Sequence, residues 1–354
     1  MQIGFFFWPF NVPLIKKLAA AAEQYDYDMV AVADTPGNAM DPWVAATLLA
    51  EHTTRPRVAL CVTNLASRLP SVSAGAIASL GLVAGNGRAV LGIGAGHSGT
   101  RNIGVQKSTS AAELAEGVKF IRTLLRGEPA EMGGGTAHLP WIKHPSKVFL
   151  AASHPKALTA AGAHADGAFI NYGLSADNVR ESEGIVMKAM QEAGRKPEEV
   201  EIWQIAALDC NEDGDLAREK VGAILAFVSG YVIGEKDLEK RGVPEQYREP
   251  LLELRRRYST RPGDADIRLV RELGLFDYLS KRLSICGTPD ECLEQMVAAK
   301  AAGVKRLMFT ISLAADPLKT VELFAQKVFP ATRASRPPAF AIVFIAVVHP
   351  AASG

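Results

Sequence analysis

The stretch that decides the fold is Ala89–Gly104, which reads AVLGIGAGHSGTRNIG. Its first part, Ala89–Ile93, has the short, apolar composition of a buried strand, and glycines follow at once. In a dinucleotide-binding Rossmann unit, such a turn follows the first strand, opens a helix directly and precedes an acidic residue by about 20 positions. Here three predicted strands come first, and a polar stretch separates the turn from the next predicted helix, Ala111–Leu125. The pattern therefore favours one βα unit within a longer series.

The same alternation of short apolar runs and longer amphipathic runs continues along the whole chain, as in folds built from βα units. Eight predicted strands, each followed by a helical pattern, match the strand number of a (β/α)8 barrel. We therefore predict an α/β fold of the TIM-barrel type. The predicted strands are Ile3–Phe7, Met29–Ala33, Val58–Thr63, Ala89–Ile93, Lys147–Ala151, Gly167–Asn171, Glu201–Leu208 and Arg306–Ile311. The predicted helices are Leu14–Gln24, Pro42–His52, Val72–Val83, Ala111–Leu125, Lys156–Ala163, Ala176–Ala193, Asp215–Val228 and Pro317–Val328.

The composition limits the function broadly. With 48% apolar residues, 22% charged residues and a net charge of +1, the 354-residue chain is expected to bury a large core. The sequence has no basic block, so nucleic acid binding is not expected. The four cysteines lack the spacing of a zinc or redox motif, and the N-terminus lacks an export signal. These features favour free thiols and a cytoplasmic location.

Three segments depart from the βα rhythm. Residues 230–282 are rich in charge and in helical patterns, so we expect a helical insertion before the last strand, which forms either a lid or an outer contact. Arg126–Ser146 is expected to form a loop or a short hairpin over the barrel. The apolar tail 334–354 is shorter than the roughly 20 apolar residues of a membrane span, so it is expected to be an extended appendage or a cloning or frame artefact, and no membrane association is expected. Residues 1–333 would form the single barrel domain.

The residues at the carboxyl ends of barrel strands form the active site in this fold, which limits the candidates. Asp34 follows the second strand, where it could cap a helix or contact a ligand, and we favour the ligand. Cys61 lies in the third strand, and a lone thiol with apolar neighbours is more often packed than nucleophilic. Thr63 and Asn64 offer uncharged hydrogen-bond groups that suit an amide-rich ring such as a flavin or deazaflavin, although turn formation would use the same groups.

Small-residue turns after the next three strands form a second group of candidates. Their glycines let the backbone approach a bulky ligand, and their N–H and hydroxyl groups can hold phosphate or carbonyl oxygens. Together, on one face, they would surround a planar cofactor that carries a phosphate. These candidates are Gly94, Ala95, Gly96, His97 and Ser98 after the fourth strand, Ala152, Ser153 and His154 after the fifth, and Gly173 and Ser175 after the sixth.

The sequence contains no motif that predicts a metal site or a hydrolase. The seven histidines form neither HxH nor HExxH, so no catalytic metal is expected. The acidic run Asn211–Asp215 lacks the closing glutamate of a calcium loop and is better explained as the start of a helix. No GxSxG motif is present.

Several segments near the strand ends form a recognisable set. They are Asp34, Val62–Asn64 with Arg68 and Pro70, Gly92–Gly104, Ala151–Pro155 and Ala165–Gly167. In their order, these segments resemble the motifs of the luciferase-like flavin- and F420-dependent oxidoreductases, and the resemblance spans about residues 1–333. Within that superfamily the second and third segments look most like the F420-dependent branch typified by methylenetetrahydromethanopterin reductase.

The resemblance implies a flavin or deazaflavin at the carboxyl mouth of the barrel, a small-molecule substrate and commonly a homodimer. It also implies a non-prolyl cis peptide at Cys61–Val62, which would place both residues against the cofactor ring. Gly94–His97 would then face the ring system, and the ribityl phosphate region would be held by Ser98, Ser153, Gly173 and Ser175.

Three residues depart from the pattern of the F420-dependent sugar and alcohol dehydrogenases in this family. Thr35 stands where they have histidine, His97 where they often have glutamate, and Leu69 where they have histidine or asparagine. These differences disfavour a dehydrogenase of that kind and leave His97 as the expected proton donor.

The leading hypothesis is hydride transfer between a reduced F420-type or flavin ring and a small organic substrate beneath the 230–282 insertion. Asp34 would orient the reactants, and His97 would exchange a proton. The alternative is an FMN-dependent two-component monooxygenase, which would take reduced flavin from a partner flavin reductase and consume oxygen. A third reading is a flavin-binding relative without catalytic activity. The expected cofactor is coenzyme F420, with FMN as the alternative.

Overall fold

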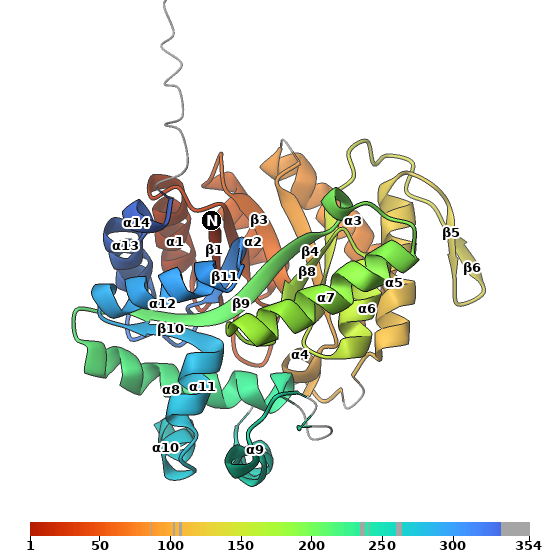
Figure 1. The fold of residues 1–354 in the computed structure, drawn as a ribbon. Helices are drawn as coiled ribbons and strands as arrows, with labels where there is room; N and C mark the ends of the chain where they lie inside the picture. Colours follow the sequence, from red (N-terminus) through yellow and green to blue (C-terminus); the bar gives the residue numbers. More distant parts are fainter. Residues whose placement is uncertain are drawn as a thin grey trace, which may run out of the picture.

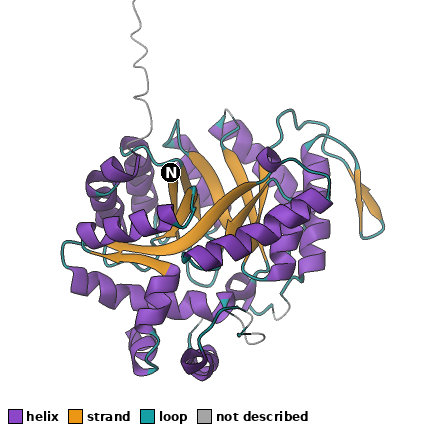
Figure 2. Cartoon of the chain, viewed as in Figure 1, coloured by secondary structure: helices purple, strands orange, loops and turns teal. Residues whose placement is uncertain are grey.

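The eight predicted strands form a closed parallel barrel in this computed structural model, which describes residues 1–85, 87–101, 103–105, 108–233, 238–239, 241–259 and 264–333. Each strand pairs in parallel with its neighbours, and β11 closes the ring between β9 and β1. The barrel strands are β1 (Gln2–Phe7), β2 (Met29–Val32), β3 (Arg57–Asn64), β4 (Ala89–Gly94), β7 (Lys147–Ala152), β8 (Gly167–Ile170), β9 (Glu201–Cys210) and β11 (Arg306–Thr310). The predicted TIM barrel is therefore confirmed (Figure 1, Figure 2).

Helices surround the barrel, and most of them begin within two residues of the predicted positions. Proline in the first turn and a polar cap start several of them; Asp41, for example, accepts hydrogen bonds from the N–H groups of Trp43 and Val44. These helices are α1 (Val12–Gln24), α2 (Pro42–Glu51), α3 (Pro70–Ala84), α5 (Ala111–Leu125), α6 (Pro155–His164), α7 (Ala176–Glu192), α12 (Pro289–Ala301), α13 (Pro317–Lys327) and α14 (Phe329–Arg333). A five-residue helix, α4 (His97–Arg101), lies where the sequence predicted a polar loop.

The core has two layers, one between barrel and helices and one inside the barrel. The inner layer contains large buried rings, among them Phe149, Phe169 and Trp203. Because these rings fill the barrel, the space for a ligand lies at its mouth rather than along its axis.

The insertion before the last barrel strand is helical, as predicted. The seventh strand leads into α8 (Gly214–Val232), and α9 (Glu245–Arg257), α10 (Asp264–Glu272) and α11 (Phe276–Leu283) follow. These helices share a buried apolar cluster with Cys286 and Ala207, and they lie at the same end of the barrel as α4 (Figure 1). The insertion is therefore packed onto the mouth of the barrel.

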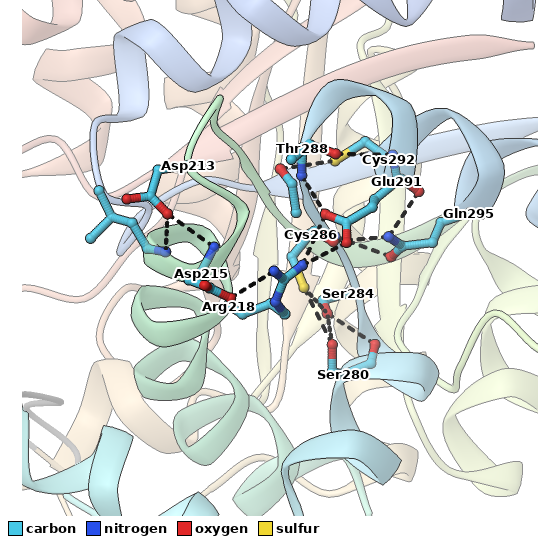
Figure 3. Close-up of polar contacts among 12 residues, drawn as sticks. Asp213, Asp215, Arg218, Ser280, Ser284, Cys286, Thr288, Glu291, Cys292 and Gln295 are labelled. Carbon is cyan, nitrogen blue, oxygen red and sulfur yellow. Dashed lines mark hydrogen bonds and ion pairs between the residues drawn. The ribbon is translucent and has the colours of Figure 1, made fainter.

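A ninth strand of the large sheet, β10 (Ser284–Gly287), was missed by the sequence analysis because it begins directly after α11, with no turn to mark its start. It pairs in parallel with β9, outside the closed ring. On its other side, the side-chain amide of Gln295 donates to the Cys286 carbonyl (2.8 Å) and accepts from the Cys286 N–H (3.1 Å) (Figure 3). This amide occupies the hydrogen-bonding positions that an adjacent strand would use, so it protects the edge.

The acidic run Asn211–Asp215 lies at the start of α8, as the helix-start interpretation predicted. Asp213 accepts hydrogen bonds from the N–H groups of Asp215 and Leu216, and Arg218 in the next turn contacts both Asp215 and Glu291 of α12 (Figure 3). The acidic side chains are thus used for helix capping and for an ion-pair link between α8 and α12.

The two remaining segments outside the βα rhythm are Arg126–Ser146 and the tail 334–354. A short hairpin forms from β5 (Ala130–Met132) and β6 (Gly135–Ala137), but it stands beside the barrel in Figure 1 rather than over it. The tail 334–354 lies outside the described residues. Within the described ranges, none of the helices is long and apolar enough to cross a bilayer.

Candidate active site

A cavity of about 460 Å³ lies at the carboxyl ends of the barrel strands. It receives residues from both of the predicted turns that follow β4 and β7, so these turns share one rim. The predicted residues that line it are Asp34, Cys61, Val62, Thr63, Asn64, Gly94, Ala95, Gly96, His97, Ala152, Ser153 and His154. Gly173 and Ser175 are not among the lining residues; Ser175 instead caps α7 by accepting from the Asn178 N–H. The side chain of Ser98 lies outside the described part of the structure.

The walls of the cavity are largely apolar, and the sequence analysis did not identify them. Phe6, Phe169 and Ile205 point inward from β1, from β8 and from β9, while Phe227 and Val232 come from α8. The strand residues could have been found from the alternation of inward and outward positions. The contribution of α8 depends on how the helix packs across the mouth, so no local signal predicts it.

The third strand contains the predicted cis peptide between Cys61 and Val62. The pairing register of β3 with β4 shifts between Leu60 and Thr63, at the same place. A Cβ atom at Gly94 would lie 2.8 Å from Cγ2 of Val62, closer than real Cβ contacts allow. Gly94 therefore makes room for the Val62 side chain, whereas the sequence had suggested room for a ligand. Burial raises the pKa of the Cys61 thiol, as expected for a packed thiol and not for a nucleophile.

Two further residues at the rim, Gly96 and Asn64, pack against each other. Gly96 has a φ of 84°, and a Cβ there would lie 2.9 Å from Cβ of Asn64. The Asn64 side chain accepts hydrogen bonds from the N–H groups of Ala66 and Ser67. Asn64 thus forms the turn that was the alternative to ligand binding, while still lining the cavity.

The polar end of the cavity contains one carboxyl group. Among the described lining residues, Asp34 is the only acidic side chain, and its Oδ2 accepts a hydrogen bond of 2.6 Å from the Thr63 hydroxyl. Burial raises the pKa of Asp34, and the Thr63 hydrogen bond offsets part of that effect. Asp34 therefore retains a proton to higher pH than an ordinary aspartate.

The other predicted catalytic residue, His97, begins α4. Burial is the main cause that lowers the pKa of His97, and the charges of Arg101 and Arg255 act in the same direction. At neutral pH the ring is therefore mostly neutral. Helix α4 also packs closely on the second strand's end, because a Cβ at Gly99 would lie 2.7 Å from the Asp34 carbonyl oxygen.

The turn after β7 is held by a residue that sequence reasoning missed. Arg241, from the insertion, donates hydrogen bonds to Nδ1 of His154 (2.8 Å) and to the Ser153 carbonyl. It lies 87 positions from His154 in the chain, in no recognisable motif, so no sequence signal identifies it.

The cavity suits a flat ring with an amide edge. Asn171, after β8, lines the cavity, and its buried Oδ1 has no hydrogen-bond partner among the described residues. A buried acceptor of this kind can be satisfied by a ligand N–H. Thr63, Thr310 and Ser312 add hydroxyl groups to otherwise apolar walls. These groups fit a flavin or deazaflavin, whose pyrimidine edge carries N–H and carbonyl groups.

A metal site is a separate question. In the part of the chain that the structure describes, no three histidine, cysteine, aspartate or glutamate side chains gather closely enough to hold a metal ion.

Comparisons with known proteins agree with this geometry. Residues 9–306 match the family model described as luciferase-like monooxygenase. The chain is 28% identical over 337 residues to the 5,10-methylenetetrahydromethanopterin reductase of Methanolobus tindarius, covering 93% of this chain and 99% of the relative. It is 26% identical to the reductase of the same description from Archaeoglobus fulgidus, over 87% of this chain and 92% of that one.

A solved structure supports the fold. The coenzyme F420-dependent tetrahydromethanopterin reductase from Methanopyrus kandleri superposes with a TM-score of 0.77 at 22% identity, covering 94% of this chain and 99% of that chain. The motif order, the barrel and the match over residues 9–306 lead to one conclusion: the chain belongs to the luciferase-like monooxygenase family, as its sequence predicted.

Proposed function

We propose that this enzyme binds coenzyme F420 at the mouth of the barrel and transfers a hydride between it and a small organic substrate. The observation that carries the proposal is a cavity that combines apolar walls, a few uncharged polar groups and, among the described lining residues, a single carboxyl, Asp34, whose pKa is raised by burial. Family membership makes the chain an oxidoreductase. Two methylenetetrahydromethanopterin reductases are similar along almost its whole length, and the solved tetrahydromethanopterin reductase with the same fold is described as coenzyme F420-dependent, which supports F420 over FMN.

The cofactor ring would lie between apolar side chains and polar edge groups. Val62 and Phe169 would contact its faces, and Asn171 would accept a hydrogen bond from a ring N–H. When bound, F420 supplies a hydride donor or acceptor at a fixed carbon of its ring. The walls from β1 and from α8 would keep water away from the reacting atoms.

Asp34 is the better candidate for the proton donor in the reducing direction. Reduction of a polar double bond requires a proton as well as a hydride, and the donor must be protonated at the working pH. The pKa of Asp34 is raised by burial, whereas the pKa of His97 is lowered by burial and by two arginines. His97 is therefore assigned as a hydrogen-bonding group or as a proton acceptor in the opposite direction, and Thr63 holds the Asp34 carboxyl in place.

Separate titrations with F420 and with FMN test the proposal. We expect F420 to bind with a change in its fluorescence and, in its reduced form, to lose its hydride to a substrate without oxygen consumption. Tighter binding of FMN, together with oxygen consumption when reduced FMN is supplied by a flavin reductase, would instead establish the monooxygenase function. Binding of either cofactor without turnover on any substrate would favour the non-catalytic relative.

The expected partners remain predictions. They are a small-molecule substrate, a second copy of the chain in a homodimer and, for the FMN-dependent alternative, a flavin reductase. Light scattering on the purified protein measures the mass of the assembly and tests the homodimer.

A further inference from the structure

Two buried arginines of the insertion, Arg241 and Arg282, bind the turns that follow two barrel strands. They are 4% and 5% exposed. Arg241 follows α8 in the chain, and Arg282 lies in α11. Among the described residues, no carboxylate lies within ion-pair distance of either guanidinium. Their hydrogen bonds go instead to backbone carbonyls and to the side chains of His154 and Tyr278.

Arg241 joins the end of α8 to the turn between β7 and α6. Its Nη2 donates to the carbonyls of Val232 (2.6 Å) and Ser153. Its Nη1 donates to the Ile233 carbonyl and to Nδ1 of His154 (2.8 Å). The last carbonyls of a helix have no partner within the helix, so an arginine at this place satisfies them. Because each of the two nitrogens contacts both segments, the guanidinium fixes the distance between them.

Arg282 binds the next turn along the barrel, which follows β8. Its Nε donates to the Tyr172 carbonyl (3.2 Å), and its own carbonyl accepts from the Leu174 N–H (3.0 Å). Its Nη2 donates to the Arg241 carbonyl (3.1 Å), and the Arg241 guanidinium lies over the Tyr172 ring at 5.3 Å. The end of α8 and the turns after β7 and β8 are therefore connected through the two arginines.

Gly173 allows Arg282 to approach the turn after β8. Its φ is 127°, a conformation that other residues rarely adopt, and a Cβ there would lie 2.9 Å from Cγ of Arg282. The sequence had suggested that the small residue makes room for a cofactor. In the structure it makes room for the insertion.

The segments that the arginines connect form one side of the cavity. Val232 of α8, Ser153 after β7 and Asn171 after β8 all line it. Asp34 and Thr63 lie after β2 and at the end of β3, and in the described part of the chain neither arginine bonds to them. The arginines can therefore affect the shape of one side of the cavity without touching its carboxyl group.

We propose that Arg241 and Arg282 are positioning residues that bind the insertion to the turns after β7 and β8, so that this side of the cavity is formed before a ligand enters. A guanidinium carries five donors in a rigid planar fork, so one side chain can hold several segments at fixed angles. A preformed wall lowers the ordering cost of binding. The end of α8 is then a fixed wall, and neither a lid that opens nor an outer contact. The effect on ligand affinity rests on the proposed function, but the fixed wall does not.

Hydrogen exchange of the ligand-free wild type, resolved to single amides, tests the preformed wall. The Leu174 N–H reports directly on the contact, because it donates to the Arg282 carbonyl. It should exchange at least about 100-fold more slowly than in an unstructured peptide. Faster exchange would mean that the contact is open for more than about 1% of the time, and the wall would not be preformed.

Arg241→Gln tests the connecting role of the side chain. Peptides that cover residues 224–233 and 153–158 should lose protection from exchange by about tenfold or more, whereas peptides of α1 should not change. Arg256→Gln is the matched control, because Arg256 lies in the same insertion, is exposed and contacts only Glu249 and Glu253. Wild-type protection of both segments in folded Arg241→Gln would refute the proposal.

Arg241→Lys decides the same point if the glutamine variant does not fold. The lysine keeps the positive charge, but one ammonium cannot reach the acceptors that two guanidinium nitrogens contact in two segments. At least one of the two segments should therefore lose protection. Full protection of both would show that the guanidinium fork is not what holds them.

Ligand binding separates positioning from general stability. In Arg241→Gln the affinity for F420, or for FMN if wild type prefers it, should fall by about tenfold, while kcat at saturation changes by less than about twofold because Asp34 and Thr63 stay in place. Unchanged affinity in the folded variant would overturn the positioning role. If wild type binds neither cofactor, the proposed function fails, and the exchange measurements alone decide whether the wall is preformed.

Discussion

The hydroxyl of Thr63 donates to Oδ2 of Asp34 over 2.6 Å, which joins the ends of β3 and β2 at the polar side of the cavity. The hydroxyl stabilises the charged form of the carboxyl, while burial destabilises it more, so the pKa of Asp34 is raised overall. The rise in pKa comes from burial, and the Thr63 hydroxyl limits how large the rise is. The pair therefore sets the pH range over which the cavity can supply a proton.

Asp34→Asn should lower turnover by a factor of about 100 or more while changing cofactor affinity little, because the amide cannot donate the proton that a carboxylic acid provides. In wild type, turnover in the reducing direction should fall as pH rises through the raised pKa of Asp34. Thr63→Val is the matched control. Since it removes the bond that lowers the Asp34 pKa, the falling limb should move to higher pH; a limb that moves to lower pH would contradict this account.

His97→Gln should reduce turnover less than Asp34→Asn, by about tenfold, because the neutral ring is assigned to hydrogen bonding and not to proton donation. Steady-state rates in the reducing direction measure the difference. A loss as large as that of Asp34→Asn would make His97 the donor, and unchanged rates would remove it from the mechanism.

Gly94→Ala should weaken cofactor binding, because the new methyl group would lie 2.8 Å from Cγ2 of Val62 and push that side chain toward the cavity. Gly75→Ala is the control: it lies in α3, nothing lies within 4 Å of its Cβ position, and alanine should stabilise the helix by about 0.5–1 kcal/mol. Cofactor titration and thermal unfolding of both variants test this. Wild-type affinity in Gly94→Ala would show that the Val62 side chain can relax elsewhere.

Asp209→Asn should stabilise the protein at neutral pH but not at pH 4. Burial raises the pKa of Asp209 from 3.8 to about 6, so the folded state binds its proton more tightly than the unfolded state. The stabilisation that protonated Asp209 provides is complete below the pKa of the unfolded state and is lost as pH rises through the folded-state pKa of about 6. The loss amounts to roughly 3 kcal/mol. The amide avoids that cost and can still accept from the Ala315 N–H. Thermal unfolding across this range tests it; a difference that does not depend on pH would refute the assignment.

Gln295→Ala should destabilise the protein by about 1–3 kcal/mol, because the N–H and carbonyl of Cys286 would both lose their partner at the edge of β10. The exposed edge should also increase aggregation during refolding. Glu294→Ala, at the neighbouring exposed position, should change stability by less than about 0.5 kcal/mol. Equal effects of the two variants in denaturant unfolding would mean that the edge contact contributes little.

The sequence predicted most of the elements whose signal was local. All eight barrel strands occur within a few residues of the expected positions, and helix α5 has the expected bounds, because its capping box at Ser110 and Glu113 marks its start. Other elements were missed. Strand β10 begins directly after α11 without a turn, and α4 begins in a glycine-rich stretch whose composition favours a turn. Helix α12 was also missed, although a capping box at Thr288 and Glu291 marks its start.

For the site, too, residues with a local signal were identified and a residue that depends on long-range packing was missed. Asp34, Thr63, His97 and His154 were identified because each directly follows or ends a strand, and the topology of a parallel barrel brings all such residues to one rim. Arg241 was not identified, because it lies 87 residues from His154 in the chain and belongs to an insertion that contains no recognisable motif. Gly173 and Ser175 have the right composition but do not line the cavity, since Ser175 caps α7.

By itself, then, the sequence determined the barrel, the family and many of the residues at its rim, because strand patterns and turn motifs are properties of neighbouring residues. Only the tertiary structure decided how those residues act. The pKa of Asp34, the contact between Arg241 and His154 and the use of Gly94 to accommodate Val62 depend on burial and on distances of a few ångströms between segments far apart in the chain. Such distances are set by how the whole chain packs, so no local pattern encodes them.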